Sequence, residues 1–351
     1  MSSPRSSRFN AFRMLVATRI LEFFRESEVL FWNFVFPIIL AVGLGIAFRN
    51  RPAEASPVGI LDGRGATDAV AALRKAPLVK PMVESEQEAE RTLRLGRVDV
   101  VLVVRDDGSY EYRFDPSRPE AVVAKARVVD ALERAAGRKD LLTARDQAVS
   151  ETGGRYIDFL IPGMIGMNLM TGGMWGVGFN LVDMRIKKLL KRFLATPMRR
   201  ADFMLSVLTV RLISMVVEVT FLLVFGWLAF GLKVRGNPFS IFAVGLLGSL
   251  SFGGLGLLIA SRARRIEGVM GLMNVVTMPM YICSGVFFSS ERFPQATQPL
   301  IRALPLTALN DALRGIILEG TPLSAQAARL GVLAFWGAVG FIVGLKVFRW
   351  T

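Results

Sequence analysis

Long apolar runs, each followed by a short polar or basic stretch, recur along most of the chain. A run of about twenty residues is long enough to cross the hydrocarbon core of a bilayer as a helix. The pattern predicts six transmembrane helices, with the ranges 29–48, 156–182, 203–230, 238–260, 268–288 and 327–348. The expected fold class is therefore an all-α polytopic membrane protein of six transmembrane helices.

Residues 49–155 break this pattern, because strand-like and helical periods alternate there. The expected strands are 58–61, 98–104 and 110–114, and the expected helices are 67–75, 86–95 and 118–148. A turn signal, Asp107-Gly108, precedes the third strand. About a hundred residues are enough for a separate domain. The sequence thus predicts an inserted α/β domain between the first two spans.

Composition and charge place these parts relative to the membrane. Of all residues, 52% are hydrophobic, and the net charge is +14. The basic excess flanks the apolar runs, whereas residues 49–155 are nearly neutral, so the charge follows membrane topology and indicates no nucleic-acid partner. This predicts a multi-pass protein of the cell (inner) membrane, with both termini cytoplasmic and an extracytoplasmic domain at 49–155. Residues 1–28, with apolar positions every three or four residues among arginines, predict an amphipathic interfacial helix.

The cytoplasmic loop 183–202 has the sequence DMRIKKLLKRFLATPMRRAD. Ile186, Leu189, Leu190 and Phe193 recur at helical spacing among basic residues, and Pro197 ends or kinks the helix that this spacing predicts. One interpretation is a basic loop that only fixes topology. The other is a surface helix that offers its apolar ridge to a cytoplasmic partner, and only this one explains the ridge.

A second unusual segment, 289–322, follows the fifth span. It contains Pro294, Pro299 and Pro305, and its apolar stretches are too short to cross a bilayer. We expect re-entrant or interfacial half-helices on the outer side, and an ordinary outer loop is the alternative.

Polar residues inside the expected spans are candidates for a substrate path or for helix packing. Arg211 and Glu218, seven positions apart, lie on about the same helical face. Asn274 is a third candidate, since intramembrane amides commonly bridge helices. Two small-residue repeats, Gly172-x-x-x-Gly176 and Gly340-x-x-x-Gly344, would let helices approach closely.

Several kinds of chemistry are excluded by the residues themselves. The chain has no histidine and one cysteine, Cys283, so a Cys/His zinc site is ruled out. It has no G-x-x-x-x-G-K-[ST] motif to cradle nucleotide phosphates. We therefore expect no catalytic, metal or cofactor site in this chain.

Four stretches, in this order, resemble the type-2 ATP-binding-cassette (ABC) exporter permeases, in the branch with a large extracytoplasmic domain between the first two spans. They are ESEQEAERTLRLGRVDVVLVV (84–104), LLKRFLATPMRRADFMLS (189–206), SGVFFSSERFP (284–294) and LPLTALNDALRGIILEG (304–320). The resemblance implies two paired permease chains, as a homodimer or a heterodimer, and separate cytoplasmic ATPase subunits that hold ATP and Mg.

The resemblance also implies roles for particular residues. The ATPase-coupling helix would be 186–196, and the coupling residues would be Ile186, Lys187, Leu189, Leu190, Arg192, Phe193, Thr196 and Pro197. The family's outer segment would include Pro294, Pro305, Thr307 and Arg314. This chain departs from the family at 184–188, MRIKK, where many members carry a Glu and a Gly-Thr.

Three functions remain open at this point. The expected one is the permease subunit of an ABC exporter that moves a hydrophobic or amphiphilic substrate outward, since the spans are rich in Gly, Met and Phe. The second is a non-transporting ABC-type membrane subunit that transmits ATPase motion to the extracytoplasmic domain. The third is a free-standing membrane enzyme.

Overall fold

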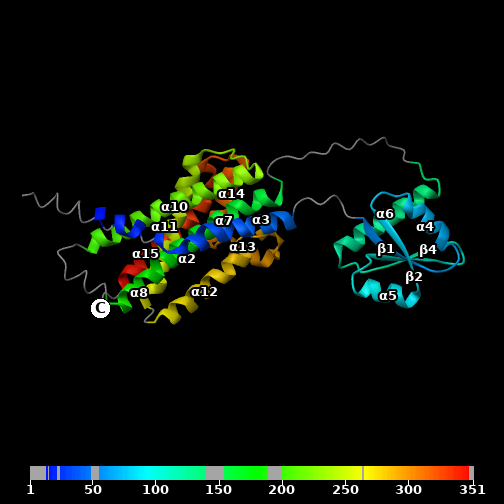
Figure 1. Cartoon of the computed structure of the whole chain (residues 1–351), viewed down its shortest axis with the longest axis horizontal. Helices are drawn as coiled ribbons and strands as arrows, with labels where there is room; N and C mark the ends of the chain where they lie inside the picture. The colour runs from blue at the N-terminus through cyan, green and yellow to red at the C-terminus, as the bar shows by residue number, and fades with distance from the viewer. Residues whose placement is uncertain are drawn as a thin grey trace, which may run out of the picture. The chain divides into compact units, whose positions relative to one another are not determined.

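The chain forms two compact units, which a computed structural model describes separately (Figure 1). One unit comprises residues 1–49 and 150–351, and the other comprises residues 50–149. The residues described are 13–14, 16–21, 24–48, 55–139, 154–188, 200–262 and 265–347. Of the amphipathic helix expected at 1–28, the described part is helical over 16–21, and Met14, Leu21 and Phe24 are exposed.

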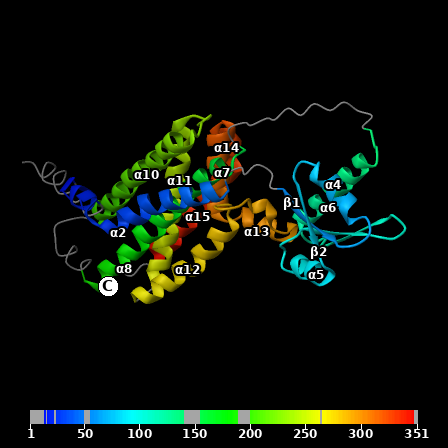
Figure 2. The same cartoon turned by 45° about the vertical axis from the view of Figure 1, so that its right-hand side comes forward.

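The first unit is a bundle of helices, seen from two sides in Figures 1 and 2. Its longer helices are α3 (Phe36–Ala47), α7 (Tyr156–Gly173), α10 (Arg200–Phe230), α11 (Pro238–Arg262), α12 (Ile266–Cys283), α14 (Pro305–Glu319) and α15 (Ala327–Val347). Its shorter pieces are α2 (Ser27–Leu30), η1 (Phe31–Val35), η2 (Met174–Phe179), α8 (Asn180–Ile186), η3 (Ser290–Arg292), η4 (Gln295–Thr297), α13 (Gln298–Arg302) and η5 (Leu323–Gln326).

Within the described residues, five helical segments are long and apolar enough to cross a membrane. They are Ser27–Ala47, Leu205–Phe230, Pro238–Ser261, Ile266–Cys283 and Leu323–Val347. These correspond to five of the six expected spans. The expected span 156–182 is helical through α7, η2 and the start of α8 but is not among the five, so it stays a prediction.

Burial explains why α7 contains polar residues and glycines. Nearly all of its residues are buried, including Asp158 and Asn168. A helix enclosed by other helices can carry polar groups and glycines, because it presents little surface to lipid. Its mixed sequence is therefore typical of the centre of a bundle.

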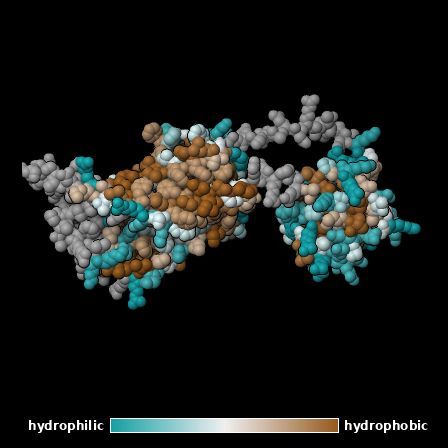
Figure 3. All heavy atoms as spheres, in the orientation of Figure 1, coloured by the Kyte–Doolittle hydropathy of each residue, from teal (hydrophilic) through white to brown (hydrophobic). Residues whose placement is uncertain are grey.

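The outer surface of the bundle is apolar over a broad area (Figure 3). Val275 of α12, Leu228 of α10 and Phe335 of α15 are among the exposed large side chains. Exposed apolar side chains at this density belong to a surface in contact with lipid or with another apolar surface. The interior is filled by α7, α11 and α14, which contribute Leu160, Phe252 and many other fully buried side chains.

Close helix contact explains one of the two glycine repeats. A Cβ added at Gly340 of α15 would lie 2.5 Å from the backbone carbon of Gly254 of α11, and one at Gly344 would lie 3.1 Å from Leu257. The repeat Gly340-x-x-x-Gly344 thus brings α15 against α11. At Gly176, by contrast, an added Cβ would meet nothing within 4 Å.

The second unit contains a four-stranded sheet with helices on both faces. Its elements are β1 (Ser56–Leu61), α4 (Ala66–Arg74), β2 (Val79–Glu84), α5 (Glu86–Arg94), β3 (Val100–Val104), β4 (Tyr110–Phe114) and α6 (Pro119–Ala135). The order is β2-β1-β3-β4, with β1 parallel to β2 and β3, and β4 antiparallel to β3. Figure 2 shows α4 and α6 on one side and α5 on the other.

One strand of this sheet was not expected from the sequence. β2, VKPMVE, contains a proline and two charged residues, and only Val79 and Glu84 are buried. It lies at the edge of the sheet, so one of its two sides has no neighbouring strand. An edge strand needs little apolar sequence, and this explains why its pattern is weak.

Candidate functional site

A buried ion pair lies inside the helical unit. Arg211 Nη1 donates to both carboxylate oxygens of Glu218, at 3.0 and 3.1 Å. The two side chains are only 7% and 1% exposed. They lie two turns apart on α10, so the long arginine side chain follows the helix axis to its partner. Charges at this burial are costly unless they are paired.

Two asparagines extend the pair to neighbouring helices. Asn33 Nδ2 donates to Glu218 Oε1 at 3.3 Å, and Asn168 Nδ2 of α7 donates to the Asn33 carbonyl at 3.0 Å. Asn33 lies in the π-helical turn η1, where the backbone departs from the regular i to i+4 pattern. The pair therefore joins α10 to the first span and, through Asn33, to α7.

The arginine also touches α7 directly. Arg211 Nη2 donates to the Leu169 carbonyl at 3.3 Å, while its Nε has no partner among the described residues. A Cβ added at Gly172 would lie 2.3 Å from Arg211 Nη1. Gly172 thus makes room for the guanidinium, and this is its role in the repeat Gly172-x-x-x-Gly176. We call Arg211, Glu218, Asn33 and Asn168 the buried polar network.

Asn274, the third intramembrane candidate, lies elsewhere. It is on the exposed face of α12, and no hydrogen bond connects it to the buried polar network within the described residues. A different hydroxyl pair joins α12 to α7, since Thr171 Oγ1 and Tyr281 Oη are 2.8 Å apart.

The cytoplasmic loop is only partly described. Ile186, at the end of α8, is 45% exposed, and Lys187 Nζ forms an ion pair with Asp183 at 2.8 Å. The other expected coupling residues lie outside the described residues, and they are Leu189, Leu190, Arg192, Phe193, Thr196 and Pro197. Close to this loop, Arg185 Nη1 donates to the Ala260 carbonyl of α11 at 3.3 Å.

The other end of α7 meets the expected outer segment. Arg314 of α14 stacks on the Phe159 ring at 3.7 Å from the ring centre and donates to the Phe159 carbonyl at 3.3 Å. It also donates to the Gly285 carbonyl and lies 3.8 Å from Asp311. One planar guanidinium thus ties together α14, α7 and the chain after α12.

The remaining outer residues behave differently from one another. Pro305 and Thr307 are buried in the first turn of α14, and the Thr307 hydroxyl has no partner among the described residues. Pro294, by contrast, is exposed, and its carbonyl accepts from Thr297, the last residue of η4. Asn310 Nδ2 donates to the Ser284 carbonyl at 2.8 Å. The buried part of α14 is thus fixed to the backbone beyond α12.

Glycines on α7 allow this outer contact. A Cβ at Gly163 would lie 2.6 Å from the Val286 carbonyl oxygen, and one at Gly166 would overlap the Asn310 amide. Sequence reasoning missed these two glycines, together with Asn33 and Phe159. A single asparagine in the otherwise apolar run 29–48 and the spacing Gly163-x-x-Gly166 are the signals that were available.

The site holds fixed charges and hydrogen bonds. In the part of the chain that the structure describes, no group of three or more His, Cys, Asp or Glu side chains could hold a metal ion. The cationic and anionic groups of the buried polar network neutralise one another. Such an arrangement can fix the relative positions of helices and can change when they move.

Apolar helices around a buried ion pair, with α14 enclosed among them, are typical of an integral membrane protein. The family model described as "ABC-2 family transporter protein" matches residues 28–346. The chain therefore belongs to the ABC-2 transporter family.

Three curated relatives are similar to parts of the chain. ABC transporter G family member 20 of Dictyostelium discoideum is 26% identical over 195 residues, which is 55% of this chain and 26% of that protein. Linearmycin resistance permease protein LnrN of Bacillus subtilis (strain 168) is 27% identical over 136 residues, 36% of this chain and 35% of LnrN. Nodulation protein J of Rhizobium meliloti (strain 1021) is 25% identical over 211 residues, 55% of this chain and 74% of that protein. The matched segments thus span about a quarter and about a third of the first two relatives.

Proposed function

We propose that this protein is the membrane-spanning permease subunit of an ATP-driven exporter. ATP would be hydrolysed by separate cytoplasmic ABC ATPase subunits, and the substrate would be a hydrophobic or amphiphilic molecule moved outward. Membership of the ABC-2 family over residues 28–346 supports this proposal. The names of two relatives, a G-family ABC transporter and a resistance permease, are consistent with it.

The proposed arrangement has six spans, two paired permease chains and both termini in the cytoplasm. Residues 50–149 would form an extracytoplasmic domain, as in the branch of the family that the sequence resembles. The basic residues around 183–202 and at Arg262 and Arg265 support the cytoplasmic side for these loops.

The single observation that best supports coupling is the continuous helical run through α7, η2 and α8. It extends from Tyr156, beside the Arg314 contact, to Ile186, at the start of the expected ATPase-coupling loop. The buried polar network joins the middle of this run to α10. A displacement of the coupling loop would therefore reach the outer segment through one connected element.

Co-purification with a candidate ABC ATPase from the same cell tests the coupling. The permease in nanodiscs should retain the ATPase, and Leu190→Glu/Phe193→Glu should lose it, because two charges replace the apolar ridge. Val122→Glu/Val123→Glu is a matched control, since both valines are exposed on α6 of the other unit. Retention of the ATPase by both double variants, or by neither, would contradict the proposed coupling loop.

Substrate stimulation separates transport from its alternative, a non-transporting subunit that transmits ATPase motion to the domain at 50–149. An exporter should hydrolyse ATP faster when a transported amphiphile is added, since substrate binding favours the conformation that hydrolyses ATP. ATPase activity that responds to no apolar or amphiphilic compound, in a complex that stays assembled, would favour the alternative.

A further inference from the structure

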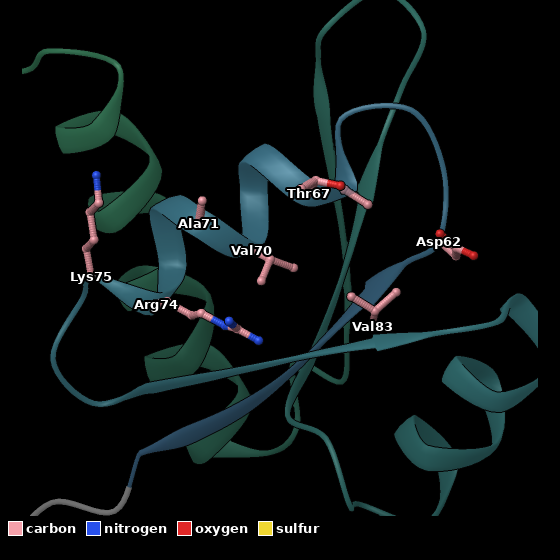
Figure 4. Close-up of a pocket in the computed structure, with 8 residues that line it drawn as sticks. Asp62, Thr67, Val70, Ala71, Arg74, Lys75 and Val83 are labelled. Carbon is pink, nitrogen blue, oxygen red and sulfur yellow. The ribbon is translucent and has the colours of Figure 1, made fainter.

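A groove lies between α4 and the edge strand β2 in the α/β unit. Its volume is about 540 Å³, within the roughly 300–1,000 Å³ of small-molecule sites. It is lined along α4 by Thr67, Val70, Ala71 and Arg74, and by Val83 of β2, and Asp62 closes one end (Figure 4). Figure 4 shows Val70 and Val83 facing each other and the Arg74 guanidinium reaching over the strand.

The apolar floor of this groove is left uncovered by the fold. Val79 and Val83 lie on the same face of β2, because side chains alternate along a strand. Val79 is buried in the core cluster that also contains Leu73 of α4, but Val83 is 54% exposed. Helix α4 therefore covers the Val79 end of this face of β2 and leaves the Val83 end exposed.

The charges at the two ends of the groove differ. Arg74, in the last turn of α4, is exposed and has no ion-pair partner within the described ranges. Lys75 lies next to it and adds a second positive charge, while Asp62 places a negative charge at the far end. An anionic group would be attracted to the Arg74 end and repelled from the Asp62 end.

A β-strand from another protein is a poor occupant, even though β2 is an edge strand. Ser56 N–H donates to the Leu78 carbonyl, and Asp62 N–H donates to the Glu84 carbonyl. The backbone N–H and C=O groups of the even-numbered residues of β2 therefore point toward β1, and those of the odd-numbered residues point to the free edge. The backbone nitrogen of Pro81, an odd-numbered residue, therefore points to the free edge and has no hydrogen to donate. Proline at this position interrupts the ladder that an added strand would need.

We propose that this groove binds a single-chain amphiphile with an anionic head group. The head group accepts hydrogen bonds from Arg74, and the apolar chain lies between Val70 and Val83. Asp62 fixes the orientation by repulsion. The site does not depend on the proposed transport function, since binding here needs neither ATP nor an ATPase.

Photo-labelling of the full-length protein tests the site. The probe is dodecanoic acid carrying a diazirine, compared with dodecanol carrying the same group, and labelled peptides are mapped by mass spectrometry. We expect the acid to label residues 62–83 about tenfold more than the alcohol does. Arg74→Gln should remove about this factor, because one charge-assisted hydrogen bond has roughly that effect.

Arg94→Gln is the matched control. Arg94 is an exposed arginine in the last turn of α5, in the same unit, so this variant also removes one positive charge from a helix end. It should leave labelling of residues 62–83 unchanged. Val83→Gln, a change at an exposed position, should reduce labelling while Arg74 is retained. Circular dichroism checks that each variant is folded.

Three results would overturn the proposal. They are equal labelling of the groove by acid and alcohol, equal effects of Arg74→Gln and Arg94→Gln, and absence of label from residues 62–83 in the folded wild-type protein. The failure of transport or of ATPase binding would not bear on any of these measurements.

Discussion

Arg211 and Glu218 form an ion pair on α10, with Nη1 3.0 Å from Oε1 and both side chains buried. Glu218→Gln keeps the shape of the side chain but leaves the buried guanidinium without a counter-charge. Removing one partner of a buried pair typically costs about 3–5 kcal/mol. We expect the free energy of unfolding, measured in detergent micelles, to fall by about this amount.

The control for the ion pair is the double variant Arg211→Leu/Glu218→Leu. It removes both charges together, so no buried charge remains unpaired, and its cost should be well below the sum of the single Leu substitutions. Additive costs would mean that the two side chains do not depend on each other.

The second prediction concerns Gly172, which lies against Arg211 Nη1. In Gly172→Ala the new Cβ would lie 2.3 Å from Arg211 Nη1, and the guanidinium is held by Glu218 and by the Leu169 carbonyl. Overpacking of this kind costs about 1–3 kcal/mol. Gly176→Ala, with nothing within 4 Å, should be neutral or slightly stabilising in the same thermal unfolding assay.

A background variant shows whether the arginine is the cause. In Arg211→Leu the guanidinium is absent, so Gly172→Ala should cost less there than in the wild type. The same cost in both backgrounds would assign the effect of Gly172→Ala to another neighbour.

Asn168 and Asn274 provide the third prediction, because both are amides in expected spans but only one is in the network. Asn168→Leu removes the hydrogen bond to the Asn33 carbonyl, and interhelical bonds in membrane proteins contribute about 0.6–1.7 kcal/mol. Asn274→Leu changes an exposed side chain on α12 and should be neutral. Equal losses in a denaturant titration would remove the distinction between the two positions.

The fold could be predicted from the sequence where a segment has a clear pattern of apolar residues. Long apolar runs predicted the five spans that are long apolar helices in the structure, and short strand-like runs predicted β1, β3 and β4, since both patterns reflect burial. The edge strand β2 was missed because half of its residues are exposed, so its sequence lacks the apolar run of a buried strand. The expected span 156–182 is helical through α7 but stays a prediction as a membrane span, because the polar groups and glycines of this buried helix keep it outside the five apolar segments.

The site was predictable only in its residue types. Arg211 and Glu218 stand out because charges are rare at such depth, and helical spacing puts them on one face. Their links to Asn33 and to the Leu169 carbonyl could not be inferred, because they join segments more than forty residues apart. Asn274 had the same sequence signal as Asn168, and only packing distinguishes them.

Helix packing at Gly340 gives the last prediction. In Gly340→Ala the new Cβ would lie 2.5 Å from the Gly254 carbon and 2.7 Å from the Leu255 nitrogen. These are backbone atoms of α11, so the two helices must separate for the methyl group to fit.

A graded series on α15 tests this reasoning without changing residue type. Gly331→Ala meets nothing within 4 Å. In Gly344→Ala the new Cβ would lie 3.1 Å from the Leu257 side chain and 3.2 Å from the Leu258 backbone nitrogen, which is less close than the contacts at Gly340. The loss of unfolding free energy should therefore increase from Gly331→Ala through Gly344→Ala to Gly340→Ala, where it should reach about 1–3 kcal/mol. Equal effects at the three positions would show that helix propensity, and not the contact with α11, determines the cost. Because α11 also packs on α7, a helix separation at Gly340 should lower the proposed export activity as well as stability.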